Sequence, residues 1–208
     1  MKEKSSNSKQ ILLSVLGVAI LVVAVVGVSF AAFSYSQTGQ YENKITTGVI
    51  SMSYSNPSNG INLTNALPTT DNTGKALTGT NNVFDFSVSA TISGTATINY
   101  AITATTTPAT TLTDSFVKVY LTDRGTGGDD GEETQVLAPT LVSALTKTGA
   151  SEASGAPQGQ FVLKTGTFSA TTTDNYRLRM WVADTFTGTS ASETYKLRVN
   201  VYGKATAR

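Results

Sequence analysis

The acidic stretch Thr122–Thr134, TDRGTGGDDGEET, holds the densest group of metal-binding side chains in the sequence. Carboxylate oxygens are the ligands that Ca²⁺ prefers, and glycines allow the tight turns of a calcium-binding loop. The stretch lacks the D-x-[DN]-x-[DN]-G spacing of an EF-hand loop. We expect a solvated loop between two strands, whose charges discourage edge-to-edge pairing. The alternative is a calcium site with the candidate ligands Asp123, Asp129, Asp130 and Glu132.

Four cations near the C-terminus form a second group that can bind a ligand. Arg177 and Arg179 alternate with apolar residues in one segment, and Lys196 and Arg198 do so in another. A row of cations on one face of a sheet can bind an acidic polymer. The interpretation that we favour is that these cations occupy the solvent-facing positions of amphipathic strands, with Trp181 partly covered on the same face.

The residues of most hydrolytic and metal-dependent enzymes are missing from the sequence. There is no cysteine and no histidine, which excludes disulfides, a conventional zinc site and the Ser-His or Cys-His pairs of nucleophilic catalysis. The formal net charge is +1, so the chain has no basic footprint for nucleic acid. We expect no enzymatic activity and no cofactor. The NLT sequence at Asn62–Thr64 matches a glycosylation acceptor, which matters only in a host that glycosylates.

The N-terminus has the features of an export signal. Ile11–Phe33 contains no charged residue, and Lys2, Lys4 and Lys9 precede it. At about 1.5 Å per residue, a helix of this length can span a hydrocarbon core of about 30 Å. The lysines hold the N-terminus in the cytoplasm, so the rest of the chain is exported to the cell surface or the extracellular space.

Small residues at the end of this apolar run favour cleavage over retention. A cut after Ala31 places Ser29 and Ala31 at the positions that signal peptidases require to be small, and a cut after Ala32 would leave Phe33 as the first residue. We therefore interpret residues 1–32 as a signal peptide, with Ala31, Ala32 and Phe33 at the cleavage site. The alternative is a retained transmembrane anchor.

Alternation of apolar and polar residues dominates the rest of the chain. In Val83–Ser93 one face carries Phe84, Phe86, Val88, Ala90 and Ile92, and in Thr95–Thr105 one face carries Ala96, Ile98, Tyr100, Ile102 and Ala104. A Ser-Gly turn signal separates the two runs. This pattern predicts an antiparallel hairpin with one solvated face.

Five more segments follow the same alternation: Gly48–Ser55, Ser115–Asp123, Gln160–Phe168, Asn175–Asp184 and Thr194–Gly203. At least seven strands separated by short polar loops predict an all-β domain over residues 45–208, an antiparallel sandwich of jelly-roll or immunoglobulin-like type. Only Glu133–Lys147 breaks the rhythm. We expect either a short helix after Pro139 or an irregular crossover there.

The segment between the apolar run and the domain, residues 33–44, is suited to pairing with another strand. Phe33, Tyr35, Gln37, Gly39 and Tyr41 alternate with hydroxyl and amide side chains. Once cleavage frees its N-terminus, such a peptide can add to an open sheet edge as a donor strand. The alternative is a flexible linker.

The N-terminal third resembles the TasA/camelysin family of secreted bacterial proteins. The likeness lies in Val26–Ser55, with its basic apolar leader, its AAF-like processing site and the first strand at Ile45–Met52, and it continues more weakly in Asn59–Pro68, Val83–Thr105 and Ser192–Thr206. The resemblance implies a jelly-roll protein, processed at the membrane by a dedicated signal peptidase, that polymerises into biofilm-matrix fibres by strand addition. The metallopeptidase activity attached to the name camelysin does not fit a chain without histidine.

We therefore expect a fibre-forming structural protein of the cell surface whose main partner is a second copy of itself. The first alternative is a membrane-anchored β-sandwich adhesin or binding domain. The second is a pilin-like filament subunit. Pilins carry a small residue at a cut before the apolar run and often a glutamate just inside it, and Asn7–Val15 has neither.

Overall fold

The computed structural model describes residues 15, 16, 18, 34–38, 45–47, 50–55, 61–64, 66–78, 83–93, 95–108, 110–125, 133–188 and 193–206 of the 208-residue chain. Its contacts divide the chain into two units, Met1–Phe33 and Ser34–Arg208. In the first unit Val15, Leu16 and Val18 are helical and exposed. The predicted cleavage residues lie outside the described part. Within the described residues, no helix has the length and apolar character needed to cross a membrane.

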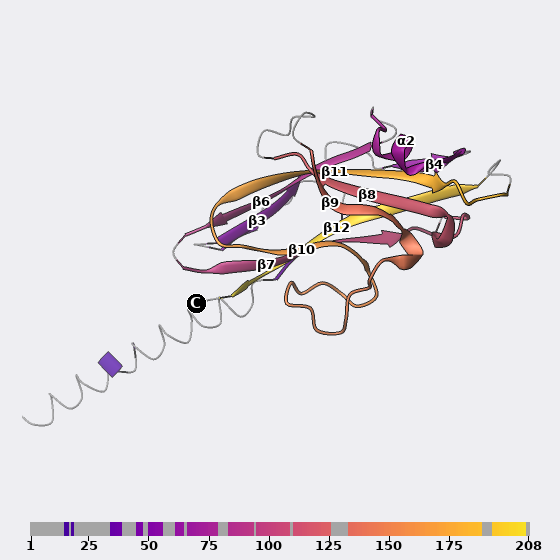
Figure 1. Ribbon diagram of the computed structural model, residues 1–208. Helices are drawn as coiled ribbons and strands as arrows, with labels where there is room; N and C mark the ends of the chain where they lie inside the picture. Colours follow the sequence, from indigo (N-terminus) through magenta and orange to yellow (C-terminus); the bar gives the residue numbers. More distant parts are fainter. Residues whose placement is uncertain are drawn as a thin grey trace, which may run out of the picture. The chain divides into compact units, whose positions relative to one another are not determined.

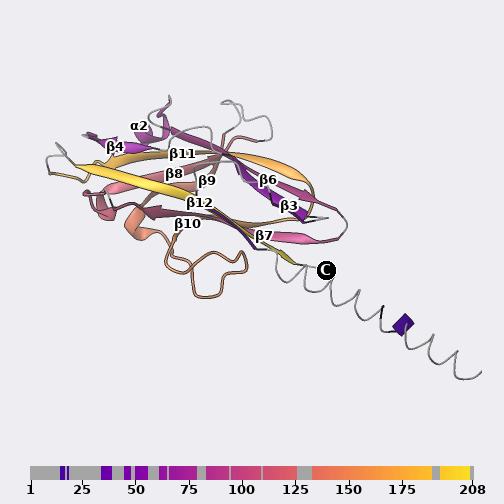
Figure 2. The ribbon, with the colours of Figure 1, turned by 180° about the vertical axis from the view of Figure 1, so that it is seen from behind.

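The second unit consists mainly of β-strands arranged in two sheets (Figures 1 and 2). The five-stranded sheet has the order β1 (Ser34–Thr38), β12 (Thr194–Thr206), β7 (Thr97–Thr106) and β10 (Phe161–Phe168), with β4 (Asn62–Thr64) also on β12. The seven-stranded sheet has the order β2 (Ile45–Thr47), β3 (Ile50–Ser55), β6 (Val83–Ile92), β11 (Thr172–Ala183), β8 (Val117–Asp123) and β9 (Thr134–Leu141), with β5 (Pro68–Thr69) beside β11. All strand pairings are antiparallel except that of β5 with β11. The prediction of an all-β domain is confirmed.

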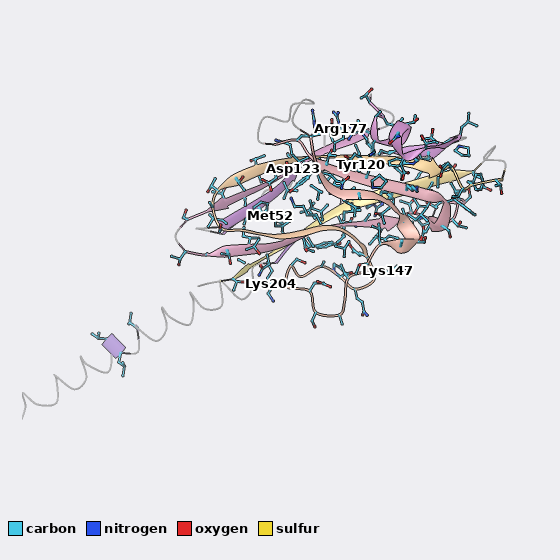
Figure 3. All side chains as sticks on the ribbon, in the orientation of Figure 1. Met52, Tyr120, Asp123, Lys147, Arg177 and Lys204 are labelled. Atoms are coloured by element: carbon cyan, nitrogen blue, oxygen red, sulfur yellow. The ribbon has the colours of Figure 1, made fainter. Side chains whose placement is uncertain are left out.

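The apolar faces that alternation predicts are the faces that form the core. Along β6 the side chains of Phe84, Phe86, Val88 and Ala90 are buried, and the alternate residues of β7 and β8 are buried in the same way. The two sheets meet through these faces. Met52 of β3, labelled in Figure 3, is fully buried and lies against Gly203 of β12, where any side chain would overlap it.

The predicted hairpin of Val83–Ser93 with Thr95–Thr105 is wrong. β6 pairs with β3 and β11, whereas β7 pairs with β12 and β10, so the short turn after Ile92 carries the chain from one sheet to the other. Both strands have one strongly apolar face. In this fold both faces are buried in the interior between the two sheets, because the strands lie in opposite sheets and not side by side in one.

The segment Glu133–Lys147, in which the alternation of apolar and polar residues is interrupted, also contains a strand. β9 runs from Thr134 through Pro139 to Leu141, and a 3₁₀ turn, η3 (Val142–Ala144), follows it, so the expected helix after Pro139 does not form. β9 lies at the edge of its sheet, and its register with β8 shifts between Val119 and Leu121. An edge strand with a bulge is where a proline is tolerated, because the missing N–H has no ladder partner to lose.

A loop and a short helix each cover part of the outer face of one sheet. The loop between η3 and β10, orange in Figure 1, brings Ala156 onto Ala101 of β7 and Tyr202 of β12. On the other sheet, α2 (Asp71–Lys75) brings Gly74 against the ring of Trp181. A second 3₁₀ turn, η1 (Asp114–Phe116), precedes β8. Trp181 is only 2% exposed, so the expectation that it is a partly covered surface aromatic is wrong.

Replacing Gly74 by alanine should lower the free energy of unfolding by roughly 1–3 kcal/mol. The added methyl group would overlap the rigid indole ring of Trp181, and this overlap outweighs the better helix propensity of alanine. Because Trp181 is the only tryptophan, thermal unfolding followed by its fluorescence reports on this contact directly. Asn72→Ala, at an exposed position of the same helix, is the control and should not destabilise the protein. Equal stability of the two variants would contradict the packing of α2 on Trp181.

Candidate functional site

β12 is the strand on which the candidate donor segment lies. One side of β12 pairs with β7 along Leu197–Thr206. The other side pairs with two short strands, β1 at Asn200–Lys204 and β4 at Thr194–Lys196. We call this second side the β12 edge. The strands β1 and β4 pair with different parts of this edge, and β1 is the terminal strand in the sheet order.

The hydrogen bonds of Lys196 show which backbone groups of β12 point to the β12 edge. Its N–H donates to Thr110 Oγ1 and its carbonyl accepts from the Thr107 N–H, so both groups point to the β7 side. Because successive residues of a strand point their backbone groups to opposite sides, Val201 and Gly203 point to β1. Val201 is opposite Gln37 and Gly203 is opposite Tyr35, which makes these the hydrogen-bonded pairs of the ladder.

The structure places part of the predicted donor strand and leaves the rest outside the described residues. Tyr35 and Gln37 lie in β1, at register positions opposite Gly203 and Val201. Phe33, Gly39 and Tyr41 are outside the described part. The glycosylation candidate Asn62 lies in β4, opposite Lys196 on the same β12 edge.

The outer face of the seven-stranded sheet carries a cluster of arginines and carboxylates that includes Arg177, labelled in Figure 3, and in which Arg177 and Arg179 are buried. Arg177 donates two hydrogen bonds of 2.7 Å to Asp85 of β6. Arg179 donates two hydrogen bonds, of 2.7 and 2.9 Å, to Glu133, which also accepts one from Arg177. Arg124 reaches Asp85 as well, at 3.1 Å. The arginine–carboxylate cluster thus joins β6 and β11 to the residue that precedes β9.

The expectation that Arg177 and Arg179 face solvent is wrong. They are 6% and 4% exposed. Lys196 and Arg198 lie on β12, in the other sheet, so the four cations do not form one basic surface. Arg177 and Arg179 can be buried because carboxylates distant in sequence neutralise them and accept their hydrogen bonds.

The cluster also sets the ionisation of its two carboxylates. Burial alone would raise the pKa of Asp85, but the hydrogen bond from Arg177 and the charges of Arg177, Arg124 and Arg179 outweigh it and lower the pKa below its ordinary value. Burial alone would also raise the pKa of Glu133. Hydrogen bonds from Arg179 and Thr122, together with the charges of the two arginines, outweigh burial and lower that pKa. Both groups are therefore carboxylates at neutral pH.

A second polar cluster connects the two sheets. Lys164 of β10 donates a 2.8 Å hydrogen bond to the hydroxyl of Tyr176 on β11, and that hydroxyl donates to Asp174 at 3.1 Å. The Lys164 ammonium is also 3.8 Å from a carboxylate oxygen of Asp123. Burial, followed by the neighbouring Tyr100 and Asp174, raises the pKa of Tyr176 well above its ordinary value. Tyr176 is therefore a neutral hydrogen-bonding group at neutral pH.

The structure assigns the described residues of the acidic stretch to these two clusters. Asp123 accepts a hydrogen bond from the Gly125 N–H and approaches Lys164, while Glu133 binds the arginines. Asp129, Asp130 and Glu132 lie outside the described residues. Among the residues that are described, no group of three or more acidic side chains is arranged to hold a metal ion.

These features define an all-β protein of two sheets, with two polar clusters that pair their charges internally and a short edge strand that follows the predicted processing site. Comparison of the chain with protein-family models, with curated proteins and with solved structures finds no match.

Proposed function

We propose that the protein is a structural component of the bacterial cell surface that assembles into fibres of an extracellular matrix by β-strand addition. A signal peptidase removes the leader at the membrane near Ala31 and Ala32, and the released chain folds as a jelly roll whose first strand pairs with a second copy. The observation that carries this proposal is the place of β1. It follows the predicted cleavage site directly and, among the described strands, it is the outermost of its sheet and pairs with β12.

Three properties of β1 support the proposal. It is five residues long and polar in sequence, SYSQT, so its pairing depends on backbone hydrogen bonds. Cleavage before it would leave it attached to the domain at one end only. The chain has no cysteine, so no disulfide can join two copies, and a strand ladder provides many non-covalent contacts at once.

The two polar clusters support a structural role over an enzymatic one. In each, cations and carboxylates satisfy one another. The hydroxyl of Tyr176 donates to Asp174, but Tyr176 is fully buried in the core. Both clusters join strands that are distant in sequence, and they thereby stabilise the sheets. We therefore propose that the two clusters stabilise the subunit and take no part in chemistry on a substrate.

Proline substitution tests the proposal, because the N–H groups of β1 fall into two sets, one that points to β12 and one that points away from it. Tyr35 and Gln37 point their N–H groups to β12, so Tyr35→Pro with Gln37→Pro should remove two ladder donors and abolish fibres. Ser36 and Thr38 point theirs away from β12, so Ser36→Pro with Thr38→Pro should leave fibre formation largely intact. The chain from Phe33 to Arg208 is suitable for this, since the buried apolar side chains among the described residues all lie in the unit Ser34–Arg208.

Light scattering and electron microscopy of the unsubstituted chain and both variants give the result. Fibres from the unsubstituted chain and from the Ser36/Thr38 variant, but not from the Tyr35/Gln37 variant, are expected. If the unsubstituted chain stays monomeric at every concentration tested, the fibre proposal is wrong. If all three chains form the same fibres, strand addition through β1 is wrong.

A further inference from the structure

A lysine and two carboxylates point into the interior between the two sheets, where charged groups are uncommon. Each is opposite a fully buried residue in its strand ladder: Lys164 is opposite Ile102, Asp123 is opposite Tyr176, and Asp174 is opposite Val88. Residues opposite each other in a ladder share one face of the sheet. The side chains of Lys164 and Asp123 are accordingly only 22% and 27% exposed.

The contacts of Lys164 and Asp123 hold an amine beside a carboxyl group. The Lys164 nitrogen is 3.8 Å from one carboxylate oxygen of Asp123. The other oxygen of Asp123 accepts a 2.9 Å hydrogen bond from the Gly125 N–H. The Lys164 nitrogen also donates a 2.8 Å hydrogen bond to the Tyr176 hydroxyl and lies 4.7 Å from the centre of that ring. Neighbours from β8 and β11 therefore fix the position of the amine.

We propose that Lys164 and Asp123 condense to an intramolecular amide, an isopeptide bond, which joins β10 of the five-stranded sheet to β8 of the seven-stranded sheet. The proposal concerns a covalent modification within one chain and does not rest on fibre formation. Because the chain has no cysteine, no disulfide can link the two sheets, and this bond would supply the covalent link.

The residues present account for every atom of the reaction. An ammonium and a carboxylate together contain one amide and one water molecule, so no oxidant, cofactor or activating group is required. The attacking species is the neutral amine. The Lys164 ammonium therefore first passes a proton to the hydroxyl oxygen of Tyr176, which passes its own proton to Asp174, 3.1 Å away.

The bond changes follow from this starting point. The nitrogen of Lys164 uses its electron pair to form a bond to the carboxyl carbon of Asp123, which becomes tetrahedral. The oxygen that faces the nitrogen then leaves as water when its bond to carbon breaks. It takes two protons from the adjacent nitrogen, one of them after its return from Asp174 through Tyr176. One proton stays on the nitrogen of the amide.

Three features of the site favour the condensation. The fold holds the amine and the carboxyl group side by side, so the reaction needs no encounter in solution. The Gly125 N–H points to the oxygen that carries the negative charge while the carbon is tetrahedral. The product is a neutral amide, so the interior no longer contains the two charges of the ion pair.

A second lysine–aspartate pair provides an internal control. Lys118 donates a 2.7 Å hydrogen bond to Asp71, whose side chain is 42% exposed. Lys118 alternates with the buried Val117 and Val119, so it points to the outer face of its sheet. Water solvates the ions of this pair better than those of Lys164 and Asp123. We therefore expect Lys118 and Asp71 to remain an ion pair, although their charged groups are closer together.

Peptide mapping of the unsubstituted protein, digested with trypsin after unfolding in urea, tests the proposal. Trypsin does not cleave after a lysine whose amine has become an amide. The expected product is a branched peptide of residues 119–124 and 148–177, joined through Asp123 and Lys164 and lighter than the two linear peptides by one water molecule. Cleavage after Lys118 should be complete. Recovery of residues 119–124 and 148–164 only as linear peptides would overturn the proposal.

Asp174→Asn tests the proton route. The amide keeps the shape of the side chain and an acceptor oxygen for Tyr176, but it does not take up a proton at neutral pH. The variant should fold, as judged by circular dichroism, and form the branched peptide roughly 100-fold more slowly than the unsubstituted protein. Asp184→Asn, at an exposed carboxylate, is the control and should condense at the unchanged rate. Equal rates in the two variants would overturn the role of Asp174.

Discussion

Glu133→Ala is expected to destabilise the domain by roughly 3–5 kcal/mol, the loss typical of breaking a buried ion pair from one side. Arg179, which is 4% exposed, would keep its charge but lose both hydrogen bonds to Glu133. For a domain of this size the loss corresponds to a fall in Tm of roughly 6–20 °C, measurable by circular dichroism. Asp184→Ala, at an exposed carboxylate, is the control and should change Tm by little. Similar effects of both substitutions would contradict a stabilising role for the cluster.

The same cluster predicts how stability depends on pH. The pKa values of Asp85 and Glu133 are lower in the folded protein than their ordinary values of 3.8 and 4.5. A carboxyl group with a lowered folded pKa contributes its full stability above its ordinary pKa and loses it as the pH falls through the folded value. The difference in unfolding free energy between the unsubstituted protein and Glu133→Ala should therefore be constant near neutrality and shrink below about pH 4.5. A difference that does not change down to strongly acidic pH would show that Glu133 does not act through its charge.

Val88→Asp is expected to abolish the fold. Val88 is fully buried in β6, opposite Tyr54 of β3 and Asp174 of β11, so a carboxylate there would be buried in the interior beside the carboxylate of Asp174. Burial of an unpaired charge costs more than most domains can lose, since their total stability is only about 5–15 kcal/mol. Far-ultraviolet circular dichroism should show loss of the β-sheet signal at all temperatures.

The control for Val88→Asp is Ser87→Asp, one residue away. Ser87 lies on the opposite face of β6 and is half-buried, so the new carboxylate can reach water. This variant should remain folded, with a change in Tm of a few degrees at most. Val199→Asp and Lys196→Asp form a second such pair on β12, one buried and one half-buried. If both members of either pair are tolerated, our assignment of that strand's buried face is wrong.

The sequence predicts which residues of a strand are buried better than it predicts which strands pair. Alternation along Val83–Ile92 and Thr97–Thr106 identifies the core faces, because burial is a property of each strand by itself. The choice between a hairpin and a crossing to the other sheet depends on the partners that each strand finds. Those partners are β11 for the first and β12 for the second, and both are distant in sequence.

The burial of Arg177 and Arg179 was not predictable from their own segment. Charged residues that alternate with apolar ones normally face solvent, and the pattern is the same here. What differs is that Asp85 of β6 and Glu133, which precedes β9, are brought to the same face. The sequence contained one signal of this: Asp85 is the only charged residue of its strand. A lone carboxylate in a strand and a pair of cations in another are the pattern to look for.

The pairing of β1 with β12 has a consequence for the order in which the chain folds. These are the first and the last strands of the domain, and Tyr35 finds its partner Gly203 at the other end of the chain. Contacts between such distant residues form late, because the loop entropy of the whole intervening chain must be overcome before any ladder bond is gained. During synthesis the N-terminal segment is made first and the strand with which it pairs is made last. Until β12 has been made, β1 lacks that strand, so under the proposed export and strand addition the rate of synthesis would influence whether a newly made copy closes on itself or joins its neighbour.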